Sequence, residues 1–132
     1  MALTWKKKFE IGDQTIDMQH KKLVETYNAL VSACNSGRGR KKLEGTLDFL
    51  CEYTVQHFHD EEILMRQLDY PEFLKHKELH DDFKTTATNL ATRFKEEGPS
   101  IAVLVALNTD VGEWLVKHIV DEDKKIESYI KN

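Results

Sequence analysis

The sequence predicts an all-α protein, an up-down-up-down antiparallel four-helix bundle with an N-terminal arm. Apolar and histidine positions recur at steps of three and four along four long segments, which is typical of helices that bury one face. The few glycines and prolines fall between these segments, where helices end. Short connections make consecutive helices antiparallel neighbours. A chain of 132 residues is expected to form a single domain, 1–132, with its own core.

The elements follow in order along the chain. Residues 1–16 form the expected arm, because Trp5, Phe9 and Ile11 would pack on the bundle rather than leave the tail free. Gly37 and Gly98 follow the first and third segments as helix stops, and Pro71 suits a first helical turn. The four helices are expected at about 17–36, 41–67, 71–96 and 103–130.

Composition excludes several classes of protein. Nineteen basic and 23 acidic residues give a net charge of −4, and no basic stripe is visible, which argues against nucleic acid as a partner. No apolar run approaches the roughly 18 residues of a membrane segment, and no signal peptide is visible. Cys34 and Cys51 fall on or beside apolar stripes and are expected to be reduced. A cytoplasmic location follows.

Polar residues interrupt the inward stripes at one level of the bundle. Counted from the shared end of the bundle, one set of histidines falls roughly 16 residues along each helix. These are His20, His57, His80 and His118. A second set, Glu61, His76 and Asp123, falls roughly 20 residues along, about 6 Å further. Seven polar groups from four helices are therefore expected to converge.

Three kinds of site could use these groups. A buried hydrogen-bond network would need a donor and an acceptor for every neutral histidine, and a single zinc ion needs only about four ligands. A site for two metal ions fits best, because imidazoles bind transition metals and carboxylates can bridge two ions. His59 is a control, because it lies on the opposite face of its helix and should be exposed.

The fourth helix leaves one question open. His118 and Asp123 are five residues apart, which is about 140° on a regular helix. Both reach the core either from opposite flanks of the stripe or through a π-bulge between them, and such bulges are frequent at functional sites.

The motifs resemble those of the bacterial hemerythrins, non-haem di-iron proteins that bind oxygen, over nearly the whole chain. The resemblance is carried by Trp5 and by IGDQTIDMQH, HFHDEEILM, YPEFLKHKELH and WLVKHIVDEDKKIESYI. It implies that every ligand position of the family is filled. One iron would be bound by His76, His80 and His118, the other by His20 and His57, and Glu61 and Asp123 would bridge the pair.

The resemblance also implies a chemistry. If both irons are octahedral, the five histidines, the two bridging carboxylates and the family's oxo or hydroxo bridge fill all coordination positions but one. That vacancy lies on the iron with two histidines and suits a single diatomic molecule. Carboxylate-rich di-iron oxidases use Glu-x-x-His pairs, and this chain has none. The family's oxygen pocket uses the positions of Leu23, Phe58, Trp114, Leu115 and Ile119, which are also ordinary core positions.

The expected function is reversible dioxygen binding for transport or storage, not enzymatic catalysis. Dioxygen is the expected ligand, and an oxygen-receiving protein that the sequence does not identify is a further expected partner. The alternatives are an oxygen or redox sensor module and a di-iron enzyme that acts on peroxide or nitric oxide. Steady turnover with a reductant would favour the enzyme.

Overall fold

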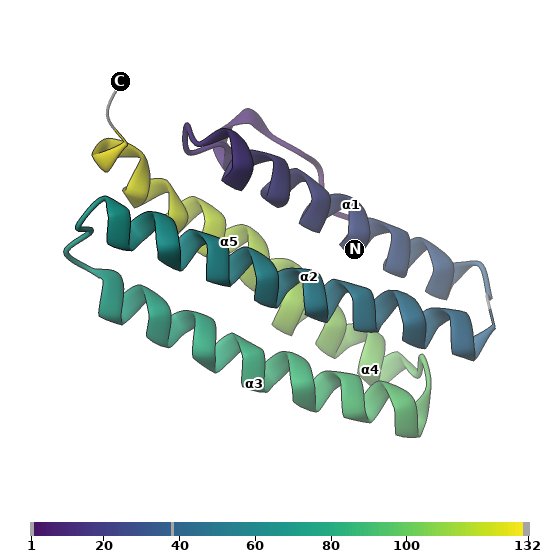
Figure 1. Ribbon diagram of the computed structural model, residues 1–132. Helices are drawn as coiled ribbons and strands as arrows, with labels where there is room; N and C mark the ends of the chain where they lie inside the picture. Colours follow the sequence, from purple (N-terminus) through teal and green to yellow (C-terminus); the bar gives the residue numbers. More distant parts are fainter. Residues whose placement is uncertain (1, 38, 131–132) are drawn as a thin grey trace.

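The predicted all-α four-helix bundle is confirmed. The computed structural model describes residues 2–37 and 39–130, and within these ranges it contains helices and irregular chain but no strand. The helical rods of the bundle lie side by side along one common direction (Figure 1). Three are single helices, α1 (Gln14–Asn35), α2 (Arg40–Gln67) and α3 (Phe73–Glu97). The fourth is a continuous series of α4 (Ile101–Ala106), η2 (Leu107–Glu113), α5 (Trp114–Asp121) and η3 (Asp123–Tyr129).

Capping residues explain where the helices begin. The Asp13 side chain accepts a hydrogen bond from the Ile16 amide at 3.0 Å, so α1 begins at Gln14, earlier than expected. Ser100 caps Val103 in the same way at 3.2 Å, so α4 begins at Ile101. Pro71 lies in the turn before α3 rather than in its first helical turn.

The arm is tied to the bundle at both of its ends. Leu3 exchanges two backbone hydrogen bonds with the Asn28 side chain, at 2.7 and 2.8 Å. The short helix η1 (Lys7–Phe9) buries Phe9, and Ile11 is buried beyond it. Further along, the Ile11 amide donates to the Asp17 carboxylate at 2.6 Å. The arm therefore forms part of the core, as its aromatic and apolar residues predict.

The fourth rod contains a wide turn, and its position differs from the one considered above. The segment η2 is a π-helix that lies before Trp114, not between His118 and Asp123. Within it, Gly112 packs against Tyr27 of α1, because a Cβ atom at Gly112 would lie 2.5 Å from the Tyr27 hydroxyl oxygen. Beyond α5 the rod instead tightens into the 3-10 helix η3.

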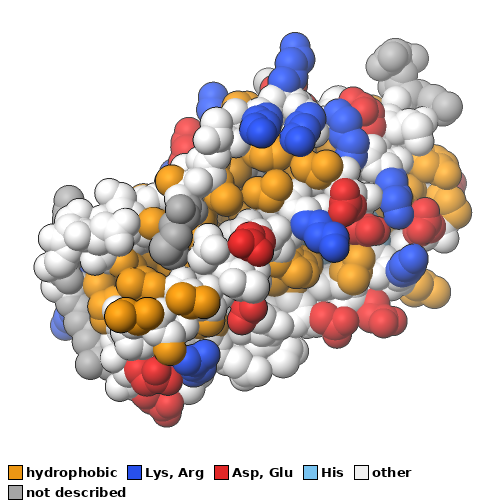
Figure 2. Space-filling model, turned by 180° about the vertical axis from the view of Figure 1, so that it is seen from behind, with side chains coloured by type: hydrophobic (Ala, Val, Ile, Leu, Met, Phe, Trp, Pro, Cys, Tyr) orange, Lys and Arg blue, Asp and Glu red, His pale blue; other side chains and the backbone are white. Residues whose placement is uncertain are grey.

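The surface carries no single-sign stripe on the face seen in Figure 2. Several lysine and arginine side chains gather at the upper edge of this view, most acidic side chains lie across the rest of the face among further basic ones, and apolar patches lie between them (Figure 2). Among the described residues, no helix combines the length and apolar character needed to cross a membrane. Cys34 and Cys51 are both free thiols and half-buried.

Candidate metal centre

Seven buried polar side chains meet in the core at the level that the sequence predicts. They come from every rod of the bundle, and each is at most 5% exposed. They are His20 of α1, His57 and Glu61 of α2, His76 and His80 of α3, His118 of α5 and Asp123 of η3. The exposed His59 does not take part, as its position on the opposite face of α2 predicts.

The side chains form two groups that share both carboxylates. In each group the potential ligand atoms all lie within 4.8 Å of one another. The first group contains His76, His80 and His118 together with Glu61 and Asp123, and the second contains His20 and His57 with the same two acids. Geometry alone therefore separates the histidines into three and two.

Each carboxylate turns one oxygen toward each group. Glu61 Oε1 lies 2.9 Å from His76 Nε2 and 3.2 Å from His80 Nε2, whereas Oε2 lies 3.4 Å from His57 Nε2. Asp123 repeats the pattern, because Oδ1 lies 3.0 Å from His76 Nε2 and Oδ2 lies 2.9 Å from His20 Nε2. This is the arrangement expected of carboxylates that bridge two cations.

Outer hydrogen bonds fix how three of the rings are oriented. His20 Nδ1 donates to the Phe9 backbone carbonyl at 2.8 Å, and His80 Nδ1 lies 2.9 Å from Glu62 Oε2. Since a carbonyl and a carboxylate only accept, the hydrogen of each ring sits on Nδ1. Nε2 of each neutral ring then points a lone pair into the site, ready to bind a metal.

The hydrogen of His57 is also held on Nδ1, here by a side-chain amide oxygen. Its Nδ1 lies 2.8 Å from Gln19 Oε1. The Gln19 amide nitrogen donates to Asp60 Oδ2 at 2.7 Å, and Asp60 can only accept. The amide oxygen must therefore face His57, and the His57 Nδ1 must carry the hydrogen.

The inward-facing atoms require cations. His118 Nε2 lies 3.1 Å from His80 Nε2 and 3.2 Å from His76 Nε2, so three ring nitrogens converge on one point. Among the described residues, Glu61 Oε2 and Asp123 Oδ1 are buried without a hydrogen-bond partner. Lone pairs that face lone pairs in a dry core are costly unless a proton or a metal ion lies between them. The donor set therefore fits a pair of metal ions.

Without a metal ion, protons on the histidines separate the facing ligand atoms. Burial alone would lower the pKa of His20 and His76, but hydrogen bonds and charge from Asp123 and Glu61 raise both to about 10. Burial likewise opposes ionisation of Glu61, yet the surrounding histidines hold its pKa well below the usual range. The pKa of His57 is lowered, chiefly by burial. A metal ion would compete with these protons.

The predicted pocket residues differ in burial and in their contacts. Leu23, Phe58, Leu115 and Ile119 are all buried in one apolar cluster. Phe58 stacks on the His80 ring, with centroids 3.8 Å apart and planes within 6°. Trp114 is only half-buried. It stacks on His118 at 4.5 Å and borders a surface cavity of about 130 Å³.

The outer partners Gln19 and Glu62 were not expected from the sequence. The available signal was their position, because each directly precedes or follows a predicted ligand on the same helix. Neighbouring positions on a helix point about 100° apart, which does not by itself indicate a contact with a ligand on another helix.

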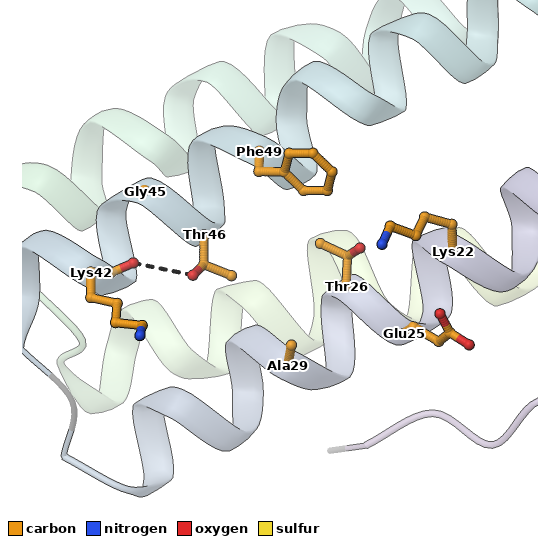
Figure 3. Close-up of a pocket in the computed structure, with 8 residues that line it drawn as sticks. All are labelled: Lys22, Glu25, Thr26, Ala29, Lys42, Gly45, Thr46 and Phe49. Carbon is orange, nitrogen blue, oxygen red and sulfur yellow. Dashed lines mark hydrogen bonds between the residues drawn. The ribbon is translucent and has the colours of Figure 1, made fainter.

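A broad surface hollow of about 650 Å³ lies between α1 and α2, and none of the seven cluster residues lines it (Figure 3). Thr26 and Ala29 line it from α1, Phe49 lines it from α2, and Lys22 and Lys42 lie toward opposite ends of the view. No buried metal-ligating group lines it. Among the described residues, the groups that could hold a metal ion are the two in the core.

Sequence comparison identifies the family. The family described as "Hemerythrin HHE cation binding domain" matches residues 12–130. This chain belongs to the hemerythrin family. It is 32% identical to the bacteriohemerythrin of Stenotrophomonas maltophilia (strain R551-3), over 98% of this chain and 82% of that protein. It is 32% identical to a hemerythrin-like protein of Naegleria gruberi, over 96% and 92%.

Known structures agree. The crystal structure of a wild-type hemerythrin superposes with a TM-score of 0.84 at 29% identity and covers 97% of each chain. The resemblance drawn from the motifs is thereby confirmed. The protein has a hemerythrin cation-binding domain, and the histidine and carboxylate cluster lies within the residues that the family matches.

Proposed function

We propose that the cluster holds two iron ions, joined by an oxo or hydroxo bridge. In this proposal His76, His80 and His118 bind one iron, and His20 and His57 bind the other. Glu61 and Asp123 bridge the two. The observation that carries the proposal is the division of each carboxylate, which presents one oxygen to each histidine group.

We further propose reversible dioxygen binding, for transport or storage, as the function. When bound and ferrous, the iron pair would supply two electrons and a single open position to one diatomic ligand. The unequal division of the histidines supports this, because it leaves the second group one donor short of the first. Five of the seven inward donors are imidazoles, which are neutral once they bind a metal ion. Neutral ligands favour a return to the ferrous pair over more oxidised iron.

The surrounding side chains would keep the ligand position dry. Leu23, Phe58, Leu115 and Ile119 carry no group that can donate a proton, and all are buried. An apolar wall admits a small neutral gas and excludes water and protons, which would otherwise make oxygen binding irreversible. The half-buried Trp114 stacks on the His118 ring, and both residues line the surface cavity of about 130 Å³.

Oxygen stoichiometry tests the proposal against an enzymatic function. Protein reconstituted with ferrous iron should hold two irons per chain and take up one dioxygen for each pair. It should show no steady turnover of peroxide or nitric oxide with a reductant. His57→Ala should abolish oxygen uptake, whereas the exposed His59→Ala should leave it unchanged. Sustained turnover, or uptake that survives His57→Ala, would contradict the proposal.

A further inference from the structure

The two histidine groups have different outer partners. In the group of three, His80 Nδ1 donates to the Glu62 carboxylate at 2.9 Å. In the group of two, His57 Nδ1 donates to the Gln19 amide oxygen at 2.8 Å, and His20 Nδ1 donates to the Phe9 backbone carbonyl at 2.8 Å. One group thus has an anionic outer acceptor, and both histidines of the other have neutral ones.

The nature of the acceptor changes the ring as a ligand. A hydrogen bond to a carboxylate is about twice as strong as one to a neutral acceptor. It draws the Nδ1 hydrogen outward and raises the basicity of Nε2. A more basic imidazole stabilises ferric iron more than ferrous iron, because the ferric ion carries the higher charge. An amide or a backbone carbonyl produces less of this effect.

The amide at position 19 is held in place by its own contacts. Gln19 is buried, and its amide nitrogen donates to Asp60 Oδ2 at 2.7 Å. Gln56 donates to the other Asp60 oxygen at 2.9 Å. The negative charge of Asp60 therefore does not reach His57 directly, because the neutral Gln19 amide lies between the two side chains.

On these grounds we propose that Glu62 and Gln19 are positioning residues that make the two metal positions electronically unlike. Glu62 acts through His80 and favours the ferric state in the group of three. Gln19 acts through His57 and makes the iron bound by the group of two easier to reduce. This group has the proposed open position. This inference rests on the proposed iron pair, and it assigns roles to side chains that do not touch the metal.

Two isosteric exchanges test it. Glu62→Gln keeps an acceptor for His80 and removes the charge. Gln19→Glu combined with Asp60→Asn keeps the hydrogen bonds between residues 57, 19, 60 and 56 and leaves the net charge unchanged. It moves the carboxylate from position 60 to position 19, where it contacts His57. Glu52→Gln removes a charge from an exposed site on the same helix as Glu62 and serves as the control.

The measurement is the midpoint potential of the iron pair, by optical redox titration of the iron-loaded proteins. Glu62→Gln should shift the ratio of oxidised to reduced iron about tenfold toward the reduced form at a fixed potential. This corresponds to an increase of about 59 mV for a one-electron step. The double variant should shift the potential in the opposite direction, and Glu52→Gln should not shift it.

Unchanged potentials in both test variants would overturn the proposal, as would shifts of the same sign. If Glu62→Gln fails to hold iron, the double variant decides through its predicted decrease in potential. If neither holds iron, the outer partners retain the metal rather than tune it, and the proposal is overturned. A wild-type iron pair that binds no oxygen would contradict the proposed function while leaving this comparison of potentials valid.

Discussion

Metal binding should release protons, and the number follows from the site. In the metal-free protein the pKa values of His20 and His76 are about 10, so at pH 8 both rings are almost fully protonated. Both must lose a proton before Nε2 can bind a metal ion. Loading at pH 8 should therefore release at least about two protons per chain, which is the contribution of these two rings. The pKa of His80 is also raised, because burial is outweighed by hydrogen bonds with Glu61 and Glu62, and a hydroxo bridge formed from water would add a proton to this minimum. Zinc and anaerobic ferrous iron should give the same number, because the protons come from the ligands and not from redox chemistry.

The assay is a pH indicator in a weakly buffered solution, or calorimetry in two buffers of different ionisation enthalpy. Release should decrease as the pH rises above about 10, where the rings are already neutral in the metal-free state. His59→Ala should give the wild-type number, since that ring lies on the surface. No release at pH 8, or release that increases above pH 10, would refute the reasoning.

The same protons determine how stability depends on pH. Folding raises the pKa of both rings above the ordinary 6.5, so protonation stabilises the metal-free fold. This contribution is fully present below about pH 6.5 and is lost as the pH rises through about 10. The melting temperature of the metal-free protein should therefore fall between pH 7 and 10. The metal-loaded protein should show no such fall in this range.

Four further predictions concern the core. Removing the metal at neutral pH should lower the melting temperature, because the two buried carboxylates lose their cations; equal melting temperatures after verified metal removal would contradict this. Leu115→Ala, at a position only 4% exposed, should cost about 2 to 5 kcal/mol in the free energy of unfolding. Leu115→Ala should also shorten the lifetime of the oxygenated form before irreversible oxidation, whereas His59→Ala should not. Equal lifetimes would contradict the view that apolar side chains around the site protect bound oxygen. Gly112→Ala should cost about 1 to 3 kcal/mol, because its Cβ would lie 2.5 Å from the Tyr27 hydroxyl oxygen and 2.7 Å from the ring carbon Cζ. Tyr27→Phe, which removes a hydroxyl without a described partner, should be nearly neutral in chemical denaturation; a large loss would indicate an unrecognised hydrogen bond.

Helical periodicity accounts for most of what the sequence could predict. The spacing of His20, His57, His80 and His118 along their helices is enough to place them at one level, because the rise per residue is constant. The exposure of His59 follows from the same geometry. The division into groups of three and two came only from the family resemblance, since depth along a helix does not say which neighbours share a carboxylate oxygen.

The remaining features depend on contacts between helices. The wide turn η2 lies where Gly112 meets Tyr27 of α1, and no local pattern around Gly112 indicates that approach. The outer partners were missed for a similar reason. The Glu62 and His80 side chains meet across two helices, and the direction of each depends on packing rather than on period. The start of the first helix was expected at about 17, and the cap at Asp13 was missed although aspartate is a preferred N-cap residue.

Oxygen binding by the reduced, iron-loaded protein tests the central proposal most directly. The account predicts that oxygen changes the absorption spectrum with one dioxygen per chain, and that vacuum restores the original spectrum over repeated cycles. It also predicts that the iron remains bound throughout. Irreversible oxidation on the first exposure, or a spectrum that vacuum does not restore, would contradict the proposal that this site carries oxygen reversibly.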